Sequence, residues 1–200
     1  MKKDFVYLAS ASPRRSELLR QIGVPFEVRP AAILEKRSPL EAPEAYVRRL
    51  AAAKAEAVGA ALGQHELRAV LAADTAVVLD EAVLGKPADL RAATEMLERL
   101  SGRSHRVLTA VALRCGDSVE TLLSESEVRF RATTAAERLA YCATGEPFDK
   151  AGGYGIQGHS AVFVESLWGS YSGVVGLPLF ETAALLTRGG VGFWLTARAA

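Results

Sequence analysis

The segment Val70–Leu79, with the sequence VLAADTAVVL, is the most apolar stretch of the chain and constrains the fold more than any other. A short apolar run rich in Val is typical of a strand buried on both faces at the centre of a sheet. Asp74 interrupts this run. Because an ionised carboxylate is costly to bury unless it is paired, hydrogen-bonded or bound to a metal, Asp74 is a candidate functional residue. The alternative is a strand bulge in which Asp74 accepts hydrogen bonds from nearby backbone N–H groups.

A polar turn near the N-terminus, LASASPRR over residues 8–15, joins a short strand to a helix. The apolar run 5–8 has strand character, and apolar residues recur at helical spacing from residue 16 until Gly23. Ser12 is expected at the N-cap of this helix, with Pro13 as its first residue, where the missing N–H costs nothing. The turn therefore predicts a helix N-terminus presented by a strand.

Two arginines, Arg14 and Arg15, occupy the first turn of this expected helix, where their charges oppose the helix dipole. An anion bound over the turn would resolve the conflict, and phosphate is the obvious candidate, because a helix N-terminus and guanidinium groups both bind it. The alternative is a capped surface helix with two solvated arginines.

Composition limits what the chain can bind. It has 200 residues, half of them hydrophobic, so a single domain with two lobes is expected over residues 1–200. The net charge of +1 gives no support for nucleic acid or an anionic membrane as a partner. No apolar stretch is long enough to span a membrane, and no signal peptide is expected. The cysteines Cys115 and Cys142 lack CxxC spacing, which indicates free thiols and a cytoplasmic protein.

The remaining pattern mixes helices and strands. Strands are expected at residues 26–28, 107–113, 119–130 and 161–164, and helices at 43–63, 89–100, 134–143 and from 179 to just before Gly189. Residues 29–42 are expected to be a loop, residues 169–173 a turn, and the apolar tail from Val191 to dock on the body or on a partner. The strands 107–113 and 119–130 are expected to pair antiparallel around Gly116-Asp117. Buried strands of parallel type beside an antiparallel pair favour a mixed α/β sheet with flanking helices.

A glycine-dense segment over residues 148–158, FDKAGGYGIQG, comes late in the chain. This density of glycine indicates unusual backbone angles or the close approach of a ligand. The alternative is a long flexible loop, but Tyr154 and Ile156 favour a packed segment.

The polar residues that do not fit a purely structural interpretation include four cations and two carboxylates. They are Arg14, Arg15, Lys54 and Lys86, together with Glu35 and Asp74. Cations neutralise phosphate oxygens and carboxylates hold a hard divalent cation, so the set suits metal-assisted chemistry on a polyphosphate. Taken alone, Lys54 would be a solvated lysine in the middle of a helix.

Six motifs together resemble one family. They are SASPRR (10–15), ADT (73–75), GKP (85–87), DKAG (149–152), GIQG (155–158) and VGLP (175–178). From these the chain is identified as a member of the Maf (septum formation inhibitor-like) family of nucleoside triphosphate pyrophosphatases, with a match over residues 8–186. The resemblance implies a mixed α/β fold with a nucleotide-binding cleft between two lobes, related to inosine triphosphate pyrophosphatases.

The resemblance also implies the reaction and the residues that carry it. A nucleoside triphosphate is cleaved to the monophosphate and pyrophosphate with a divalent cation, Mg²⁺ or Mn²⁺. A homodimer is an expectation from the resemblance alone. Asp74 becomes the proton acceptor, and Glu35 and Asp74 the metal ligands, although Leu34 stands where the family usually has a further acidic residue. The alternative is that Asp74 serves as a metal ligand only. The expected phosphate-binding residues are Ser10, Ser12, Arg15, Lys54 and Lys86.

Three positions follow the family's division by substrate. Arg14, Thr75 and Gln157 match the subgroup that prefers dTTP and UTP over 7-methyl-GTP. Thymine and uracil present an N3–H donor flanked by carbonyl acceptors, which the amide of Gln157 can match. The alternative is that Gln157 only ties its loop together through backbone hydrogen bonds. His159, which follows this motif, is given no role.

Two other functions compete with hydrolysis. Because the family is associated with arrest of cell division, the chain could be a nucleotide-binding regulator of septum formation without significant turnover. The presence of Asp74 with the full set of cations favours an enzyme. An RNA-binding module is disfavoured by the near-neutral charge and by the lack of a basic stripe with aromatic residues.

Overall fold

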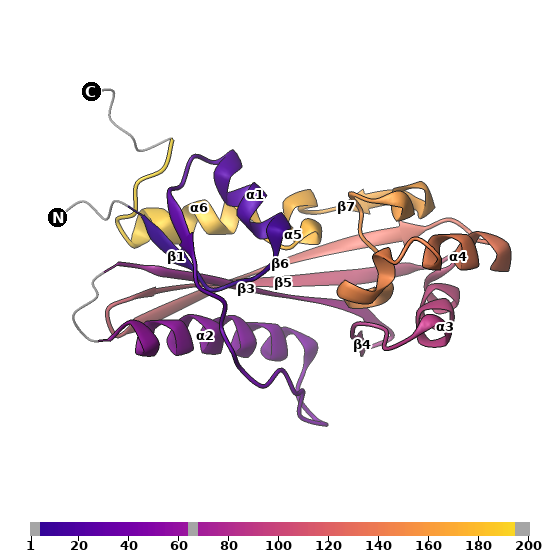
Figure 1. Ribbon diagram of the computed structural model, residues 1–200, viewed down its shortest axis with the longest axis horizontal. Coiled ribbons are helices and arrows are strands. Elements are labelled where there is room, and N and C mark those ends of the chain that lie inside the picture. The colour runs from indigo at the N-terminus through magenta and orange to yellow at the C-terminus, as the bar shows by residue number, and fades with distance from the viewer. Residues whose placement is uncertain (1–4, 64–67, 195–200) are drawn as a thin grey trace.

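The computed structural model describes residues 5–63 and 68–194. The core is a mixed seven-stranded sheet in the order β2-β1-β3-β5-β6-β7, with β4 also paired to β3 (Figure 1). The strands are β1 (Val6–Leu8), β2 (Phe26–Val28), β3 (Val70–Leu79), β4 (Ala82–Leu84), β5 (Ser104–Cys115), β6 (Ser118–Phe130) and β7 (Val164–Trp168).

The sheet is mixed around β3: one edge pairs antiparallel with β5, and the other pairs parallel with β1 near its start and antiparallel with β4 near its end. β1 runs parallel to β2 and to β3, whereas β3, β5, β6 and β7 pair antiparallel. The β5–β6 hairpin turns at Gly116-Asp117, as the sequence predicts. The prediction of a mixed α/β fold is therefore confirmed.

Helices cover both faces of this sheet. They are α1 (Pro13–Gln21), α2 (Pro43–Leu62), α3 (Leu90–Leu100), α4 (Ala135–Cys142), α5 (Tyr171–Val175) and α6 (Leu179–Arg188), with the 3₁₀ turns η1 (Glu146–Asp149), η2 (Ala151–Gly153) and η3 (His159–Phe163). No helix in residues 5–63 or 68–194 combines the length and the apolarity needed to cross a membrane.

Side chains of β3 alternate between the two faces. Ala72, Ala76 and Val78 pack against α2 on one face. On the opposite face, Ala73 belongs to the core under α1 and α6, and Val77 to the core under α3 and α4. Figure 1 shows α1 and α6 toward one end of the sheet and α3 and α4 toward the other. The second face is thus covered by two separate groups of helices.

The edge of β3 opposite β5 is open in its middle. β1 pairs with Val70 and Leu71, and β4 pairs with residues 77–79. Between these pairings, no strand of the described chain lies beside residues 72–76 on this edge. Register with β5 continues without a shift from Val70 to Val78, so the alternative of a strand bulge at Asp74 is wrong.

Two expected elements differ from the structure. The strand expected at 161–164 is instead the 3₁₀ turn η3, and β7 begins only at Val164. Phe163 packs edge-on against Phe130 and Tyr141, and this buried contact outweighs the β-propensity of the segment. The turn expected at 169–173 contains the start of α5, whose first turn Ser170 caps by accepting from Gly173 N–H at 3.0 Å.

The apolar tail packs on the body of the protein. Val191 and Phe193 are buried in the core beneath α1 and α6. The backbone N–H of Trp194 donates to Ile22 O, which joins the tail to the end of α1. The rest of the predicted tail, residues 195–200, lies outside the described residues.

A buried histidine, His105 on β5, lies in the aromatic core near α3 and α4. Its ring packs edge-on against Phe130 and Tyr154, and its Nε2 lies 2.7 Å from the Tyr154 hydroxyl. Burial lowers the pKa of His105 to about 4. The side chain is therefore neutral at physiological pH, and protonating it disfavours the folded state.

We predict that His105 makes the protein less stable in mild acid. The pKa of His105 is about 4 in the folded state and 6.5 in the unfolded chain. The stabilising contribution of the neutral His105 is therefore fully present above pH 6.5 and is lost as the pH falls through about 4. Between pH 7 and 4, the free energy of unfolding should fall in wild type by about 3 kcal/mol more than in His105→Gln. Urea unfolding at both pH values checks this, and parallel pH profiles of the two proteins would contradict it.

Candidate active site

A pocket of about 610 Å³ opens at the free edge of β3. The turn before α1 and the start of that helix line one side of it, and residues from the segment 146–158 line the other. Asp74 and Thr75 are adjacent in β3, so their side chains leave from opposite faces of the strand. Both nevertheless line the pocket, because no strand closes this edge.

All ten residues singled out from the sequence line this one pocket. They are Ser10, Ser12, Arg14, Arg15, Glu35, Lys54, Asp74, Thr75, Lys86 and Gln157. They come from the turn before α1, the first turn of α1, the loop before α2, α2 itself, β3, the loop after β4 and the glycine-dense segment. Tertiary structure thus joins residues that the sequence separates by more than a hundred positions.

The turn before α1 is organised by Ser10. Its buried hydroxyl oxygen accepts hydrogen bonds from Ser12 N–H at 3.2 Å and from Arg15 Nη1 at 3.1 Å. Ser12 is the N-cap of α1 and Pro13 its first residue, as predicted, but the Ser12 side chain makes no capping hydrogen bond. The start of the helix lines the pocket, where its partial positive charge favours an anion.

Arg15 ties three parts of the pocket together. Its Nε donates to Gly176 O at 2.8 Å, Nη1 donates to Ser10 Oγ, and Nη2 donates to Thr75 Oγ1 at 3.2 Å. Thr75 Oγ1 also lies 3.0 Å from the hydroxyl of Thr109 on β5. A guanidinium has five N–H groups, so two remain beyond these three bonds. Arg15 is therefore fixed in place while it still has donors for a ligand.

Three charged side chains form the centre of the site. Lys54 Nζ lies 2.6 Å from Asp74 Oδ1 and 2.6 Å from Glu35 Oε1. Lys54 and Asp74 are both buried, whereas Glu35 reaches in from the exposed loop before α2. Lys54 is thus not the solvated helix lysine that its local sequence suggests. Two of its three N–H groups hold carboxylates, and one remains.

The two carboxylates respond differently to this shared lysine. Burial raises the pKa of Asp74 above its ordinary value, against the opposing charges of Lys54 and Arg15. Burial would also raise the pKa of Glu35, but the hydrogen bond and charge of Lys54 outweigh it and lower that pKa. A carboxylate with a raised pKa is the better proton acceptor, and this distinguishes Asp74 from Glu35.

The carboxylates also fit a divalent cation. Glu35 and Asp74 already converge on one positive group, the Lys54 ammonium, and carboxylate oxygens are the ligands that Mg²⁺ and Mn²⁺ prefer. Within the described residues, no cluster of three or more His, Cys, Asp or Glu side chains is placed to hold a metal. Two carboxylates together with substrate phosphates are a usual arrangement for Mg²⁺.

The remaining predicted residues lie around the rim. Lys86 is exposed and makes no ion pair or hydrogen bond with the described parts of the chain, so its charge is available to a ligand. Arg14 reaches across the pocket, with Nη1 3.4 Å from Asp149 Oδ2. Gln157 is exposed, and its side chain has no hydrogen-bond partner in residues 5–63 or 68–194. The alternative that it ties the loop together thus finds no support there.

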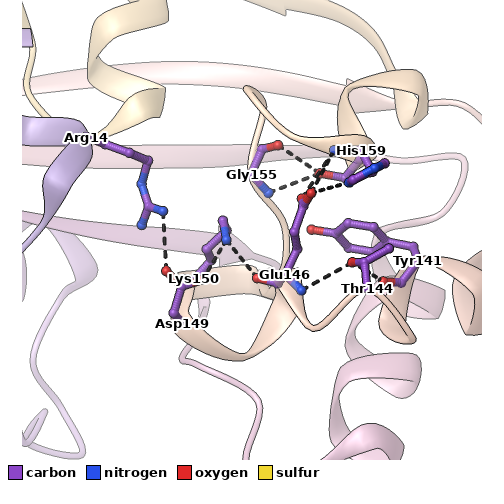
Figure 2. A network of polar contacts seen from close by, with 9 residues as sticks. Arg14, Tyr141, Thr144, Glu146, Asp149, Lys150, Gly155 and His159 are labelled. Carbon is purple, nitrogen blue, oxygen red and sulfur yellow. Dashed lines mark hydrogen bonds and ion pairs between the residues drawn. The ribbon is translucent and has the colours of Figure 1, made fainter. Parts of the chain in front are cut away.

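Three charged residues of the pocket wall were given no role from the sequence. Glu146, Asp149 and Lys150 all line the pocket from the side opposite α1. Figure 2 shows them in one network that runs from Arg14 to His159. Asp149 and Lys150 belong to the DKAG motif, which could have indicated them, but nothing local in the sequence distinguishes Glu146 from a surface glutamate.

The glycine-dense segment is packed, as Tyr154 and Ile156 indicate. Tyr154 is buried and Ile156 packs on the core beneath α1. Gly152 has a φ of +73°, and a Cβ at this position would lie 2.8 Å from Val77 Cγ2. The motif therefore approaches β3 more closely than any residue with a side chain could.

Known proteins resemble this chain over most of its length. A family model described as "Maf-like protein" matches residues 5–189. A protein of Aromatoleum aromaticum named "dTTP/UTP pyrophosphatase" is 53% identical over 192 residues, covering 90% of this chain and 93% of the relative. A protein of Burkholderia pseudomallei with the same name is 54% identical over 200 residues, covering 94% and 95%. Among solved structures, the Staphylococcus aureus Ham1 protein matches with a TM-score of 0.43 and 14% identity, covering 62% of this chain and 71% of that one.

We predict that Lys54→Met strongly destabilises the protein. The change leaves the buried Asp74 without its positive partner, which should cost about 3 kcal/mol of unfolding free energy. In the double variant Lys54→Met with Asp74→Asn, much of this loss should be recovered, because no buried charge is left unpaired. Urea unfolding of the two single variants and the double variant checks the cycle. Simple additivity of the two single effects would contradict the coupling.

Proposed function

The chain belongs to the Maf-like protein family, and from this premise we propose that it hydrolyses dTTP and UTP to the monophosphate and pyrophosphate. The observation that carries the proposal is the buried Asp74, held by Lys54 at the open edge of β3 beside the arginines of α1. The names of its relatives give the substrate class. A pocket of about 610 Å³ is of the size that small-molecule ligands occupy.

In this proposal Asp74 is the proton acceptor. It takes a proton from the water that attacks the α-phosphorus, the α–β phosphoanhydride bond breaks, and pyrophosphate leaves. Lys54 binds Oδ1, and Oδ2 has no partner in the described part of the chain, so this second oxygen can face the water. The raised pKa of Asp74 suits this role.

The triphosphate is proposed to bind over the start of α1. Arg15 offers its two remaining N–H groups, and Lys86 offers a charge that is in no ion pair or hydrogen bond with the described residues, although it lies near enough to help lower the pKa of Glu35. Ser10 and Ser12 shape the turn on which the phosphates rest, and Lys54 adds its third N–H. The negative charge of the leaving pyrophosphate is thereby neutralised from several directions.

A divalent cation, Mg²⁺ or Mn²⁺, is part of the proposal. Glu35 and Asp74 would hold it, and when bound it supplies further neutralisation of phosphate charge. The two free thiols, Cys115 and Cys142, and the nucleotide substrates support a cytoplasmic location. A homodimer is proposed from family membership alone, and sedimentation equilibrium of the purified chain tests it.

We predict that Asp74→Asn lowers kcat for UTP by roughly two to four powers of ten, because a positioned base contributes about that much. The substitution keeps the shape and one acceptor for Lys54, so the thermal unfolding curve tests folding separately. Asp117→Asn, in the exposed β5–β6 turn, is the matched control and should leave kcat unchanged.

The assay is pyrophosphate release over a panel of nucleoside triphosphates with each cation. Near-normal turnover of folded Asp74→Asn would remove Asp74 from the reaction. Binding without turnover by the wild type, for every nucleotide and both cations, would instead support a nucleotide-binding regulator of cell division.

We predict that Gln157→Glu changes the preference of the enzyme for its base. The new carboxylate faces a uracil carbonyl in place of an amide donor, and it favours the cationic base of 7-methyl-GTP. The ratio of kcat/KM for UTP to that for 7-methyl-GTP should fall about ten- to a hundredfold. Arg14 and Thr75, the other two proposed specificity residues, are unchanged in this variant.

Gln21→Glu is the control, because it adds the same charge at the exposed end of α1, outside the pocket. A ratio that Gln157→Glu leaves unchanged would show that Gln157 does not read the base. Equal losses on both substrates would show that it only maintains the loop.

A further inference from the structure

The turn that carries Gln157 is closed by its own backbone and fixed at one end by Ser160. Gly158 N–H donates to Gly155 O at 2.9 Å. The buried Ser160 hydroxyl donates to Gly155 O at 2.9 Å and accepts from Gly155 N–H at 3.0 Å. One end of the turn is therefore anchored on both backbone groups of a single residue.

Glu146 anchors the other end. The backbone N–H of His159, the residue after the turn, lies 3.2 Å from both Oε1 and Oε2 of Glu146. The His159 ring nitrogen Nδ1 also pairs with Oε1, as Figure 2 shows. The Glu146 side chain is only 22% exposed and lines the pocket. A carboxylate from η1 thus holds a backbone amide of the segment that presents Gln157.

Both glycines of the turn are explained by close contact with η1 and the residue after it. A Cβ at Gly158 would lie 2.1 Å from Glu146 Oε2, and a Cβ at Gly155 would lie 2.7 Å from Lys150 Cε. Gly158 has a φ of −105°, which any residue can adopt, so its requirement is one of space. The turn rests directly on Glu146 and Lys150.

Lys150 completes the support. Its Nζ donates to Glu146 O at 2.8 Å and to Asp149 Oδ1 at 2.6 Å. Asp149 in turn pairs with Arg14 across the pocket. The network therefore links η1, which lies under the turn, to Arg14 on the opposite wall of the pocket. Glu146 is the member of the network that binds the end of the turn, at the amide of His159.

The Gln157 amide itself has no hydrogen-bond partner among the described residues. Its position relative to a bound base is consequently set by the backbone of the turn. An amide that is free to move can rotate or withdraw, and it then contributes little binding energy, because ordering it costs entropy. Holding the backbone is what makes this side chain effective.

We propose that Glu146 is a positioning residue for base recognition: by holding the amide of His159, it fixes the turn that presents Gln157 to the base. This inference rests on the proposed function, in which Gln157 reads the base. Glu146 touches neither the phosphates nor the reacting water in this scheme, so its effect is confined to substrates that carry a base.

The test compares UTP with ribose 5-triphosphate, which has the same sugar and phosphates but no base. Glu146→Ala should lower kcat/KM for UTP about tenfold and leave kcat/KM for ribose 5-triphosphate unchanged. Glu146→Gln keeps an oxygen acceptor for the His159 amide and should retain most of the UTP activity. Glu165→Ala, which removes a surface carboxylate from β7 outside the pocket, is the matched control and should change neither substrate.

A double variant separates positioning from general damage. If Glu146 acts through Gln157, adding Glu146→Ala to Gln157→Ala should lower UTP activity no further. Equal losses on UTP and ribose 5-triphosphate, or full additivity in the double variant, would overturn the proposal. If Glu146→Ala does not fold, as judged by thermal unfolding, Gly158→Ala provides the same test, since its Cβ displaces the carboxylate.

Gln157→Ala also distinguishes this inference from the proposed function. A UTP-specific loss in Gln157→Ala but not in folded Glu146→Ala would overturn the positioning role alone. No UTP-specific loss in either variant would overturn base reading by Gln157, and the role of Glu146 with it. Absence of turnover on every substrate by the wild type would refute the proposed hydrolysis itself.

Discussion

The ion pair between Asp74 and Lys54 is the constraint on which the rest of the site depends. A carboxylate in the middle of the most apolar strand would be costly to bury alone, and Lys54 from α2 offsets that cost at 2.6 Å. Lys54 also pairs with Glu35 from the loop before α2, and this contact joins the hydrogen bonds from Tyr46 and Arg49 that hold the loop against α2. The same burial that makes the pair necessary raises the pKa of Asp74 and suits it to accept a proton.

The interrupted edge of β3 makes this arrangement accessible. If strands paired along the whole of this edge, the side chains of Asp74 and Thr75 would lie on separate faces of the sheet and could not contact the same ligand. Here β1 ends at Leu8 and β4 pairs only with residues 77–79, so one pocket reaches both faces of the strand. Arg15 spans this opening, because its guanidinium donates to Thr75 on β3 and to the backbone carbonyl of Gly176 after α5. It thereby connects α1 to β3 and to the end of α5 at an edge where no strand does so.

The elements that the sequence predicted well are those whose signals are local. The apolar run of β3, Pro13 at the start of α1 and the Gly116-Asp117 turn between β5 and β6 depend on neighbouring residues. The position of β7 was missed because the packing of Phe163, a tertiary contact, decides it. The six family motifs contain eight of the ten site residues, and Glu35 and Lys54 lie outside them. The sharing of Lys54 by two carboxylates could not be deduced, since α2, β3 and the loop meet only in three dimensions.

The two walls of the pocket differ in what they contribute. The wall formed by α1, α2 and β3 holds the buried Lys54 and Asp74 and the half-buried Arg15. Its two cations suit the phosphates that all nucleotides share. The opposite wall holds the Gly155–Gly158 turn on Glu146 and Lys150. Its contacts are hydrogen bonds to backbone and close approaches at glycine, which fix geometry without adding charge at the reacting atoms. In the proposed function, Gln157 reads the base from the second wall, whereas Arg14 and Thr75, the other two specificity residues, lie on the first wall beside the phosphate contacts. A substitution under the turn, such as Glu146→Ala, is therefore the change that separates the reading of the base by Gln157 from the chemistry.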